Sequence, residues 1–241
     1  MANTYFQFKK FTIHQDKCAM KVCTDSCLLG STQPTTTLAN QPILTILDVG
    51  TGTGLLSLMA AQLNINAKIT AIEIEPNALL QASYNVANSI YKNSIVVKEY
   101  DFMESNSTEK YDLIICNPPF YNNQLKSNTV EKNMAHHSLQ FSFTQFFENA
   151  FTQLQTNGIL TILIPYNSLV GIVNIALQKQ LHLYKIIQVQ QTPQHQYFRS
   201  VVYFCITKSD TINYSTISIK NSENEYSKAF EALLNPFYLK K

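Results

Sequence analysis

The chain has 241 residues, enough for one large α/β domain and too few for two domains of ordinary size. Hydrophobic residues make up 45% of it and charged residues 14%, a composition that excludes intrinsic disorder. No run of about 18 apolar residues and no signal-peptide core is present, so we expect a soluble, cytoplasmic protein without a membrane span.

The net charge and the cysteine content narrow the possible classes of protein further. The net charge is only +2, with mildly basic flanks around an acidic centre, which is weak support for a polyanionic partner. The five cysteines are an odd number and form no CxxC pair, which argues against a disulfide framework and a zinc site. We therefore assign no metal.

The first 42 residues differ from the rest of the chain. Several prolines and threonines follow the segment Lys17 to Leu29, and we expect an arm that covers the end of a sheet. From residue 43 onward, short β-branched runs alternate with helical stretches. The pattern predicts seven strands and four helices, the strands at 43–49, 68–73, 94–99, 111–117, 159–165, 183–190 and 201–208, and the helices at 55–63, 76–89, 141–154 and 167–179.

Strands that alternate with helices and read as near-continuous apolar runs predict a parallel sheet covered on both faces. A short loop containing Pro193 joins the last two strands, so we expect these to be antiparallel. The predicted fold is a doubly wound, mostly parallel seven-stranded sheet with an antiparallel edge strand. We expect one domain, 1–241, composed of the arm (1–42), the core (43–208) and a C-terminal strand and helix (209–241).

A glycine-rich turn, Asp-Val-Gly-Thr-Gly-Thr-Gly at 48–54, follows the first core strand and opens the first core helix. Glycines here let the backbone turn tightly and approach a ligand closely. The acid at its head, expected to face the ligand, disfavours a pyrophosphate and favours a cationic ligand. S-adenosylmethionine therefore fits better than NAD; a turn without a ligand is the alternative. The predicted cofactor-binding residues here are Asp48, Gly50, Thr51, Gly52 and Gly54.

Two further acids follow core strands. Glu73 ends the second strand, where a carboxylate accepts hydrogen bonds from ribose hydroxyls, and we add its neighbour Ile74 to the cofactor site. Glu75 competes for this role, but Glu73 is the residue that ends the apolar run. Asp101 and Phe102 follow the third strand, and we expect the acid to accept from an adenine amine while the ring covers the base. Alone, such a pair is more often a surface turn.

The tetrapeptide Asn117-Pro118-Pro119-Phe120 ends the fourth core strand. The paired prolines fix two backbone angles, remove two donors and keep Asn117 extended. The resulting corner presents a side-chain amide, bare carbonyl oxygens and a ring, the groups needed to hold a planar nitrogen. We predict that these four residues form the catalytic site.

Taken in order, the four motifs resemble those of class I, Rossmann-like S-adenosylmethionine-dependent methyltransferases, and residues 117–120 resemble the Asn-Pro-Pro-aromatic signature of the amino-methylating branch. Segments 17–30 and 226–239 are similar to bacterial methyltransferases that form N6-methyladenosine at position 37, beside the anticodon of a valine tRNA. The resemblance implies a Rossmann-like fold, S-adenosyl-L-methionine as cofactor and the anticodon stem-loop of a tRNA as partner. We expect no obligate protein partner.

The resemblance also implies individual roles. The side-chain oxygen of Asn117 and the carbonyl of Pro118 accept the N–H groups of the target amine, and Phe120 stacks on its plane. Part of the arm is implied to lie over the methionine end of the cofactor, although an amphipathic cover packed only for stability is the alternative. The arm residues concerned are Lys21, Thr24 and Asp25.

The chain departs from this family in its basic residues. His136-His137 follows an alanine where the family typically shows Arg-His, and the single arginine is Arg199. His137 either packs beneath the loop or takes part in binding. Methylation of other RNA or of DNA, protein glutamine-N5 methylation, and a cofactor-binding scaffold without catalysis are the alternatives. The residues expected to face RNA are Phe120, Tyr121, Lys126, Lys132 and His136.

Overall fold

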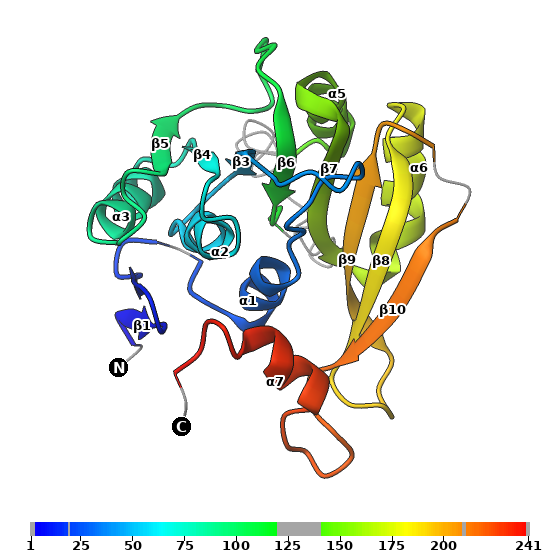
Figure 1. Ribbon diagram of the computed structural model, residues 1–241. Coiled ribbons are helices and arrows are strands. Elements are labelled where there is room, and N and C mark those ends of the chain that lie inside the picture. Colours follow the sequence, from blue (N-terminus) through cyan, green and yellow to red (C-terminus); the bar gives the residue numbers. More distant parts are fainter. Residues whose placement is uncertain (1–2, 19, 120–140, 209–210, 240–241) are drawn as a thin grey trace, which may run out of the picture.

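The computed structural model describes residues 3–18, 20–119, 141–208 and 211–239. Within this part of the chain the main sheet has eight strands, in the spatial order β10-β8-β9-β7-β6-β3-β4-β5 (Figure 1). Their bounds are Thr45–Val49 (β3), Lys68–Glu73 (β4), Ile95–Glu99 (β5), Tyr111–Cys116 (β6), Leu154–Pro165 (β7), His182–Gln190 (β8), Tyr197–Cys205 (β9) and Asn213–Ser218 (β10).

The doubly wound, mostly parallel sheet is confirmed, with two differences in detail. β9 runs antiparallel to β7 and β8, and every other neighbouring pair in the main sheet is parallel. The strand count is eight because β10, from the C-terminal segment, pairs with β8. The antiparallel strand β9 therefore lies between β8 and β7, and the polar, mostly exposed β10 forms the edge of the sheet.

Helices cover both faces of the sheet (Figure 1). Helices α1 (Thr24–Ser31), α2 (Leu55–Leu63), α3 (Pro76–Ala87) and α7 (Lys228–Leu234) contribute to one apolar cluster. Helices α5 (Phe143–Gln153) and α6 (Leu169–Gln178), the latter preceded by the short helix η2 (Tyr166–Ser168), contribute to the cluster on the opposite face. This three-layer arrangement is what continuous apolar strands require.

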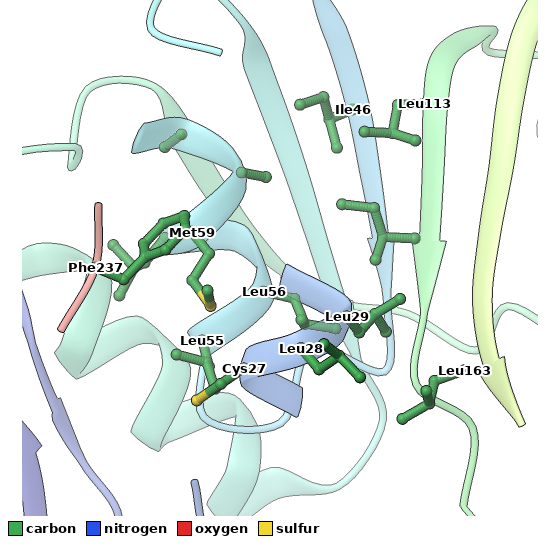
Figure 2. Packing of buried hydrophobic residues seen from close by; sticks show 14 of the residues in the cluster. Cys27, Leu28, Leu29, Ile46, Leu55, Leu56, Met59, Leu113, Leu163 and Phe237 are labelled. Carbon is green, nitrogen blue, oxygen red and sulfur yellow. The ribbon is translucent and has the colours of Figure 1, made fainter. Parts of the chain in front are cut away.

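Helix α1 is held against α2 by close packing. Leu28, Leu29 and Leu56 are almost completely buried, and Figure 2 shows them between the two helices and the sheet. A Cβ atom at Gly30 would lie 2.3 Å from the sulfur of Met59, so a larger residue there would require the buried Met59 side chain to move. The C-terminal half of α1 is thus part of the core.

The boundary between α5 and β7 differs from the prediction. The strand was predicted to begin at residue 159, after a helix over 141–154, but α5 ends at Gln153 and β7 begins at Leu154. The pairing of β6 with β7 is irregular there, since its register shifts between Tyr111 and Leu113. At Gly158 a Cβ atom would lie 2.9 Å from the carbonyl oxygen of Tyr111, so this glycine serves the irregular strand pairing.

The arm and the C-terminal residues pack on each other. Strands β1 (Tyr5–Gln7) and β2 (Thr12–His14) form an antiparallel hairpin. Phe8 is bridged to Tyr238, and the amide of Lys9 donates to the carbonyl of Phe237 at 2.7 Å. The two ends of the described chain therefore lie close together (Figure 1). In the described part of the chain, no helix is long and apolar enough to cross a membrane.

Candidate active site

The carboxyl ends of neighbouring strands meet at one edge of the sheet and bring the predicted motifs together. The register pairs Val49 of β3 with Ile72 of β4 on one side and with Cys116 of β6 on the other. The glycine turn, Glu73 and Asn117 follow these three residues directly, so they lie side by side. Edges of this kind, where strand order reverses, are the usual ligand sites of doubly wound sheets.

The glycine turn is built around left-handed backbone. Gly50 has φ 67° and Gly52 has φ 58°, angles that other residues adopt only with strain. A Cβ atom added at either position would meet nothing within 4 Å. The amides of Gly50 and Thr51 both donate to the carbonyl of Ile72, at 2.9 and 3.0 Å. The turn is thus tied to β4 while its outer side stays open.

Asp48 lies beneath this turn. Its side chain is 0% exposed, and Oδ2 accepts from the hydroxyls of Thr51 and Ser57, both at 2.6 Å. Oδ1 is buried and has no hydrogen-bond partner in the described part of the chain. Burial raises the pKa of the Asp48 carboxyl from 3.8 to about 6, against the lowering effect of the two hydroxyls. The carboxylate was expected to face the ligand; the structure instead places it under the turn, where it acts by charge and by orienting Thr51.

Glu73 joins the glycine turn to the end of β4. Its Oε2 accepts from the amide of Gly52 at 2.8 Å, and Oε1 accepts from the amides of Ile74 and Glu75 at 2.9 and 3.0 Å. Glu75 is committed elsewhere, because its carboxylate caps α3 by accepting from the amides of Asn77 and Ala78. These amides lower the pKa of Glu75. Of the two acids, Glu73 is therefore the one at the turn.

The other residues predicted to touch adenine divide into two groups. Ile74 is 47% exposed beside Glu73 and offers an apolar surface. Asp101 is partly exposed, and its Oδ1 accepts from the amide of Met103 at 2.8 Å. Phe102, by contrast, is 3% exposed and packs with Phe146, their ring centroids 5.5 Å apart. The ring of Phe102 was expected to cover the base; in the structure it anchors this loop in the core.

Asn117 presents an unsatisfied acceptor at the centre of the site. Its Oδ1 is buried without a hydrogen-bond partner among the described residues, and its Nδ2 approaches the weakly accepting sulfur of Met20 at 3.9 Å. Leaving a buried acceptor unpaired costs about 1–3 kcal/mol, and such groups cluster at functional sites. Pro118 is buried and Pro119 exposed, whereas Phe120 lies outside the described residues, as does the predicted RNA-facing segment 121–137.

Residues of the arm contact the site and the strand beside it. The sulfur of Met20 lies 3.9 Å from Nδ2 of Asn117. Burial raises the pKa of the Cys18 thiol to about 11, and the charges of Glu73, Glu75 and Asp16 contribute to this rise. Asp25 receives a hydrogen bond from Arg199 at 2.8 Å. The roles that the resemblance implies for three arm residues at the methionine end stay predictions; of these, Lys21 and Thr24 are exposed and Asp25 partly buried.

Two buried polar residues of α3 hold the arm in place and escape sequence reasoning. The amide of Asn85 donates to the carbonyls of His14 and Thr53, both at 2.8 Å, and its oxygen accepts from the amide of His14 at 2.9 Å. Gln81 accepts from the amide of Lys17 at 2.9 Å. Asn85 therefore links the arm to the glycine turn. The available signal was the spacing of four residues, which puts both side chains on one face of α3.

The residues at this edge fit S-adenosylmethionine. Open space at Gly50 and Gly52 allows close approach of a ligand to the backbone. Oε2 of Glu73 accepts one hydrogen bond of the two it can take, which leaves capacity for a ribose hydroxyl. Ile74 supplies an exposed apolar surface, and the buried negative charge of Asp48 favours a cationic ligand over a phosphate.

Comparison with known proteins agrees with this geometry. A family model described as "Methyltransferase small domain" matches residues 23–192. Two proteins named tRNA1(Val) (adenine(37)-N6)-methyltransferase are each 37% identical to the chain. The one from Flavobacterium psychrophilum aligns over 98% of this chain and 99% of its own, and the one from Pseudoalteromonas translucida over 98% of each.

Solved structures support the fold. A predicted O-methyltransferase from Agrobacterium tumefaciens has a TM-score of 0.67 at 16% identity, covering 88% of this chain and 96% of its own. A precorrin-6y C5,15-methyltransferase from Geobacter metallireducens has a TM-score of 0.52 at 15% identity, covering 80% and 93%. At such identities the likeness concerns the Rossmann-like architecture alone.

Proposed function

The chain belongs to the family of the tRNA1(Val) (adenine(37)-N6)-methyltransferases, and on that premise we propose that it methylates N6 of adenosine 37 in a valine tRNA. It is a methyltransferase, and its methyl donor is S-adenosylmethionine. The proposal extends to its location, since a tRNA substrate implies action in the cytoplasm.

One observation carries the proposal: the buried, unpaired Oδ1 of Asn117 at the same sheet edge as the glycine turn. An exocyclic amine brings N–H donors, which this oxygen lacks in the described part of the chain. A hydroxyl substrate would offer only one donor, and a carbon nucleophile none. An amine therefore suits the site best.

The residues act by placing the amine for direct, in-line transfer. Asn117 Oδ1 and the Pro118 carbonyl accept the two N–H groups, which draws the nitrogen lone pair out of conjugation with the ring. The cofactor supplies an electrophilic methyl group on its sulfonium. Asn117 and Pro118 would hold the amine nitrogen toward this methyl group, and after the transfer the nitrogen would release one proton to solvent. Alignment of reactants alone contributes roughly 7–11 kcal/mol to such reactions.

The cofactor is held at the other half of the edge. We assign Glu73 to the ribose, Ile74 and Asp101 to the adenine, and the glycine turn to the part next to the methyl group. Asp48 contributes its buried charge beneath the turn. Phe102 is buried and supports the loop from the core, so we assign its backbone and not its ring to the adenine.

An anticodon-loop adenosine suits this site because it is single-stranded and can be turned out at small cost. Stacking of a base on an aromatic side chain contributes about 1–3 kcal/mol. Phe120 and Tyr121 are the proposed platform, and Lys126, Lys132 and His136 the proposed phosphate contacts; all five lie outside the described residues.

The experiment is methyl transfer from labelled cofactor to an anticodon stem-loop of valine tRNA, with a matched stem-loop carrying guanosine at position 37. We expect label in the first RNA only. Mass spectrometry of valine tRNA from cells with and without the gene should show loss of N6-methyladenosine at that position. Label on other RNA, on DNA or on protein glutamine, with none on this stem-loop, would refute the assignment of substrate.

A further inference from the structure

An ion pair joins the arm to the far side of the site. Arg199 on β9 donates through Nε to Oδ2 of Asp25, in the first turn of α1, at 2.8 Å. The two side chains are 26% and 22% exposed, so the pair is shielded from most of the solvent. The guanidinium also donates through Nη1 to the carbonyl of Phe198 at 3.1 Å and lies 5.5 Å from its ring. Its head group is therefore fixed on both sides.

The position of this pair is set by the sheet register. Arg199 is opposite Pro165, the last residue of β7, and β7 is the neighbour of β6. It therefore lies at the same carboxyl edge as Asn117, on the side away from the glycine turn. The chain consequently crosses the edge from Cys18 near Glu73, past Met20 at Asn117, to Asp25 at β9.

The first turn of α1 needs such a tether. The second half of the helix is fixed by core packing of Cys27, Leu28 and Leu29, as Figure 2 shows. Cys23 and Thr24 at its start are exposed, and the interaction of Cys23 with Ser26 is local. The ion pair of Asp25 with Arg199 thus connects this turn to strand β9. It fixes the helix end of segment 20–24, in which Val22 is partly buried and donates its amide to Gln15 at 2.8 Å while the other residues are exposed.

The residue type also points to a precise geometry. All the other 17 basic residues of the chain are lysines, and the single arginine stands here. A planar guanidinium with several fixed donors can bond Asp25 and the Phe198 carbonyl at once. A lysine ammonium lacks the Nε–H and the plane, and it would hold Asp25 less rigidly.

We propose that Arg199 is a positioning residue of the methyl transfer: acting through Asp25, it holds segment 20–25 against Asn117 and so fixes the wall of the amine pocket. The proposal rests on the function proposed above. It predicts a larger effect on turnover than on cofactor affinity, because the hydrogen bonds described for the glycine turn and Glu73 do not involve the pair. It thereby replaces the cofactor-binding role that the resemblance implies for Asp25. A misplacement of about 1 Å at a reacting group can lower a rate about a hundredfold.

The test compares Arg199→Gln, Asp25→Asn, the double variant and Arg199→Lys. Turnover and KM for the stem-loop RNA, cofactor Kd by calorimetry, and thermal midpoint are measured for each. We expect turnover at least tenfold lower in both single variants, a cofactor Kd within about threefold of wild type, and a double variant no worse than the poorer single one. Arg199→Lys should recover part of the turnover.

The matched control is Lys179→Gln, which breaks the ion pair of Lys179 with Glu148 between α6 and α5 on the other face of the sheet. It should leave turnover unchanged. Amide exchange supplies a readout without activity: residues 20–25 should exchange faster in Arg199→Gln and Asp25→Asn, and as in wild type in the control. This readout tests the pair even if the wild-type enzyme proves inactive on tRNA, which would instead overturn the proposed function.

Three results would overturn the positioning role. A weaker salt dependence and a higher RNA KM in Arg199→Gln alone would make Arg199 a direct phosphate contact. A cofactor Kd more than tenfold higher in Asp25→Asn alone would make Asp25 a cofactor ligand. Unchanged turnover in both, with only a lower thermal midpoint, would make the pair a purely structural tie.

Discussion

The two halves of the active edge differ in how completely their polar groups are satisfied. On the cofactor side, Glu73 accepts three backbone N–H groups and Oδ2 of Asp48 accepts two hydroxyls. On the amine side, Oδ1 of Asn117 is buried without a partner in the described part of the chain, and the nearest arm contact is the sulfur of Met20. The cofactor half is largely hydrogen-bonded in advance, apart from the buried Oδ1 of Asp48, whereas the acceptor that Asn117 offers to an amine has no partner among the described residues.

The polar groups of the two halves therefore have different roles before a ligand binds. Satisfied groups at the glycine turn hold a left-handed backbone in place before any ligand binds. The acceptor of Asn117 is available for a hydrogen bond from an amine, which favours that substrate over one without N–H donors. Changes on the two sides should therefore affect different measurable quantities.

The largest effect is expected for Asn117→Ala. It removes the acceptor that holds the amine, so turnover should fall by about a hundredfold or more, the scale seen when one aligned hydrogen bond to a reacting group is lost. Cofactor Kd should stay within about threefold, because the cofactor half is untouched. Steady-state kinetics and calorimetry measure the two. The exposed Asn93→Ala serves as control, and retained turnover in Asn117→Ala would favour a non-catalytic scaffold.

Asp48 is expected to make the free energy of unfolding depend on pH. Its pKa is about 6 in the folded protein and 3.8 ordinarily, so the folded state binds the proton more tightly. Its contribution to stability is fully present below about pH 4 and is lost as the pH rises through about 6, up to about 3 kcal/mol. Urea unfolding of wild type and Asp48→Asn between pH 4 and 7.5 measures the difference. If the free energies of unfolding of the two proteins changed with pH in the same way, the raised pKa of Asp48 would be contradicted.

A smaller effect is expected for Glu73→Gln. Loss of the charge weakens the bond to the Gly52 amide and the proposed bond to the ribose, so cofactor Kd should rise about tenfold, near 1.4 kcal/mol. Glu75→Gln is the matched control two residues away. Removing its negative charge weakens the α3 cap and should lower the thermal midpoint with cofactor Kd unchanged. Equal shifts of Kd in both would mean that the two acids were wrongly distinguished.

The smallest effect is expected for Asn85→Ala. The substitution leaves groups of His14 and Thr53 without their partner and should cost about 1–2 kcal/mol. Amide exchange should accelerate first in residues 12–17 and next in the glycine turn. Ser83→Ala, exposed on the same helix, is the control and should change neither. Faster exchange in the arm without any change at the turn would show that Asn85 does not couple them.

Much of the fold follows from patterns that are local in the sequence. Apolar runs ending in Glu73 and at Cys116 fixed both the strands and their ligand-facing ends, because parallel strands of a wound sheet end at one edge. The C-terminal strand was predicted, but not its place in the main sheet: β10, whose sequence Asn-Tyr-Ser-Thr-Ile-Ser is that of a polar edge strand, pairs with β8. The alternation signal failed at Gly158, which has the sequence of a helix stop but lies in a strand irregularity.

The parts of the site that the sequence could not supply depend on long-range packing. Nothing near Phe102 distinguishes a ring that covers a base from one that packs on Phe146, since that choice depends on α5. The pair of Arg199 with Asp25 joins residues 174 positions apart. The position of a motif in the sequence predicts which residues lie at the carboxyl edge of the sheet. Only the tertiary structure shows which of their polar groups already have hydrogen-bond partners.

The hairpin of β1 and β2 is seated on Phe237 and Tyr238, which are synthesised after every strand of the main sheet. During translation the sheet and the glycine turn can form long before those residues leave the ribosome. The arm, and with it the wall beside Asn117, can close only afterwards. The nascent chain is therefore expected to acquire its capacity for cofactor before its capacity for turnover.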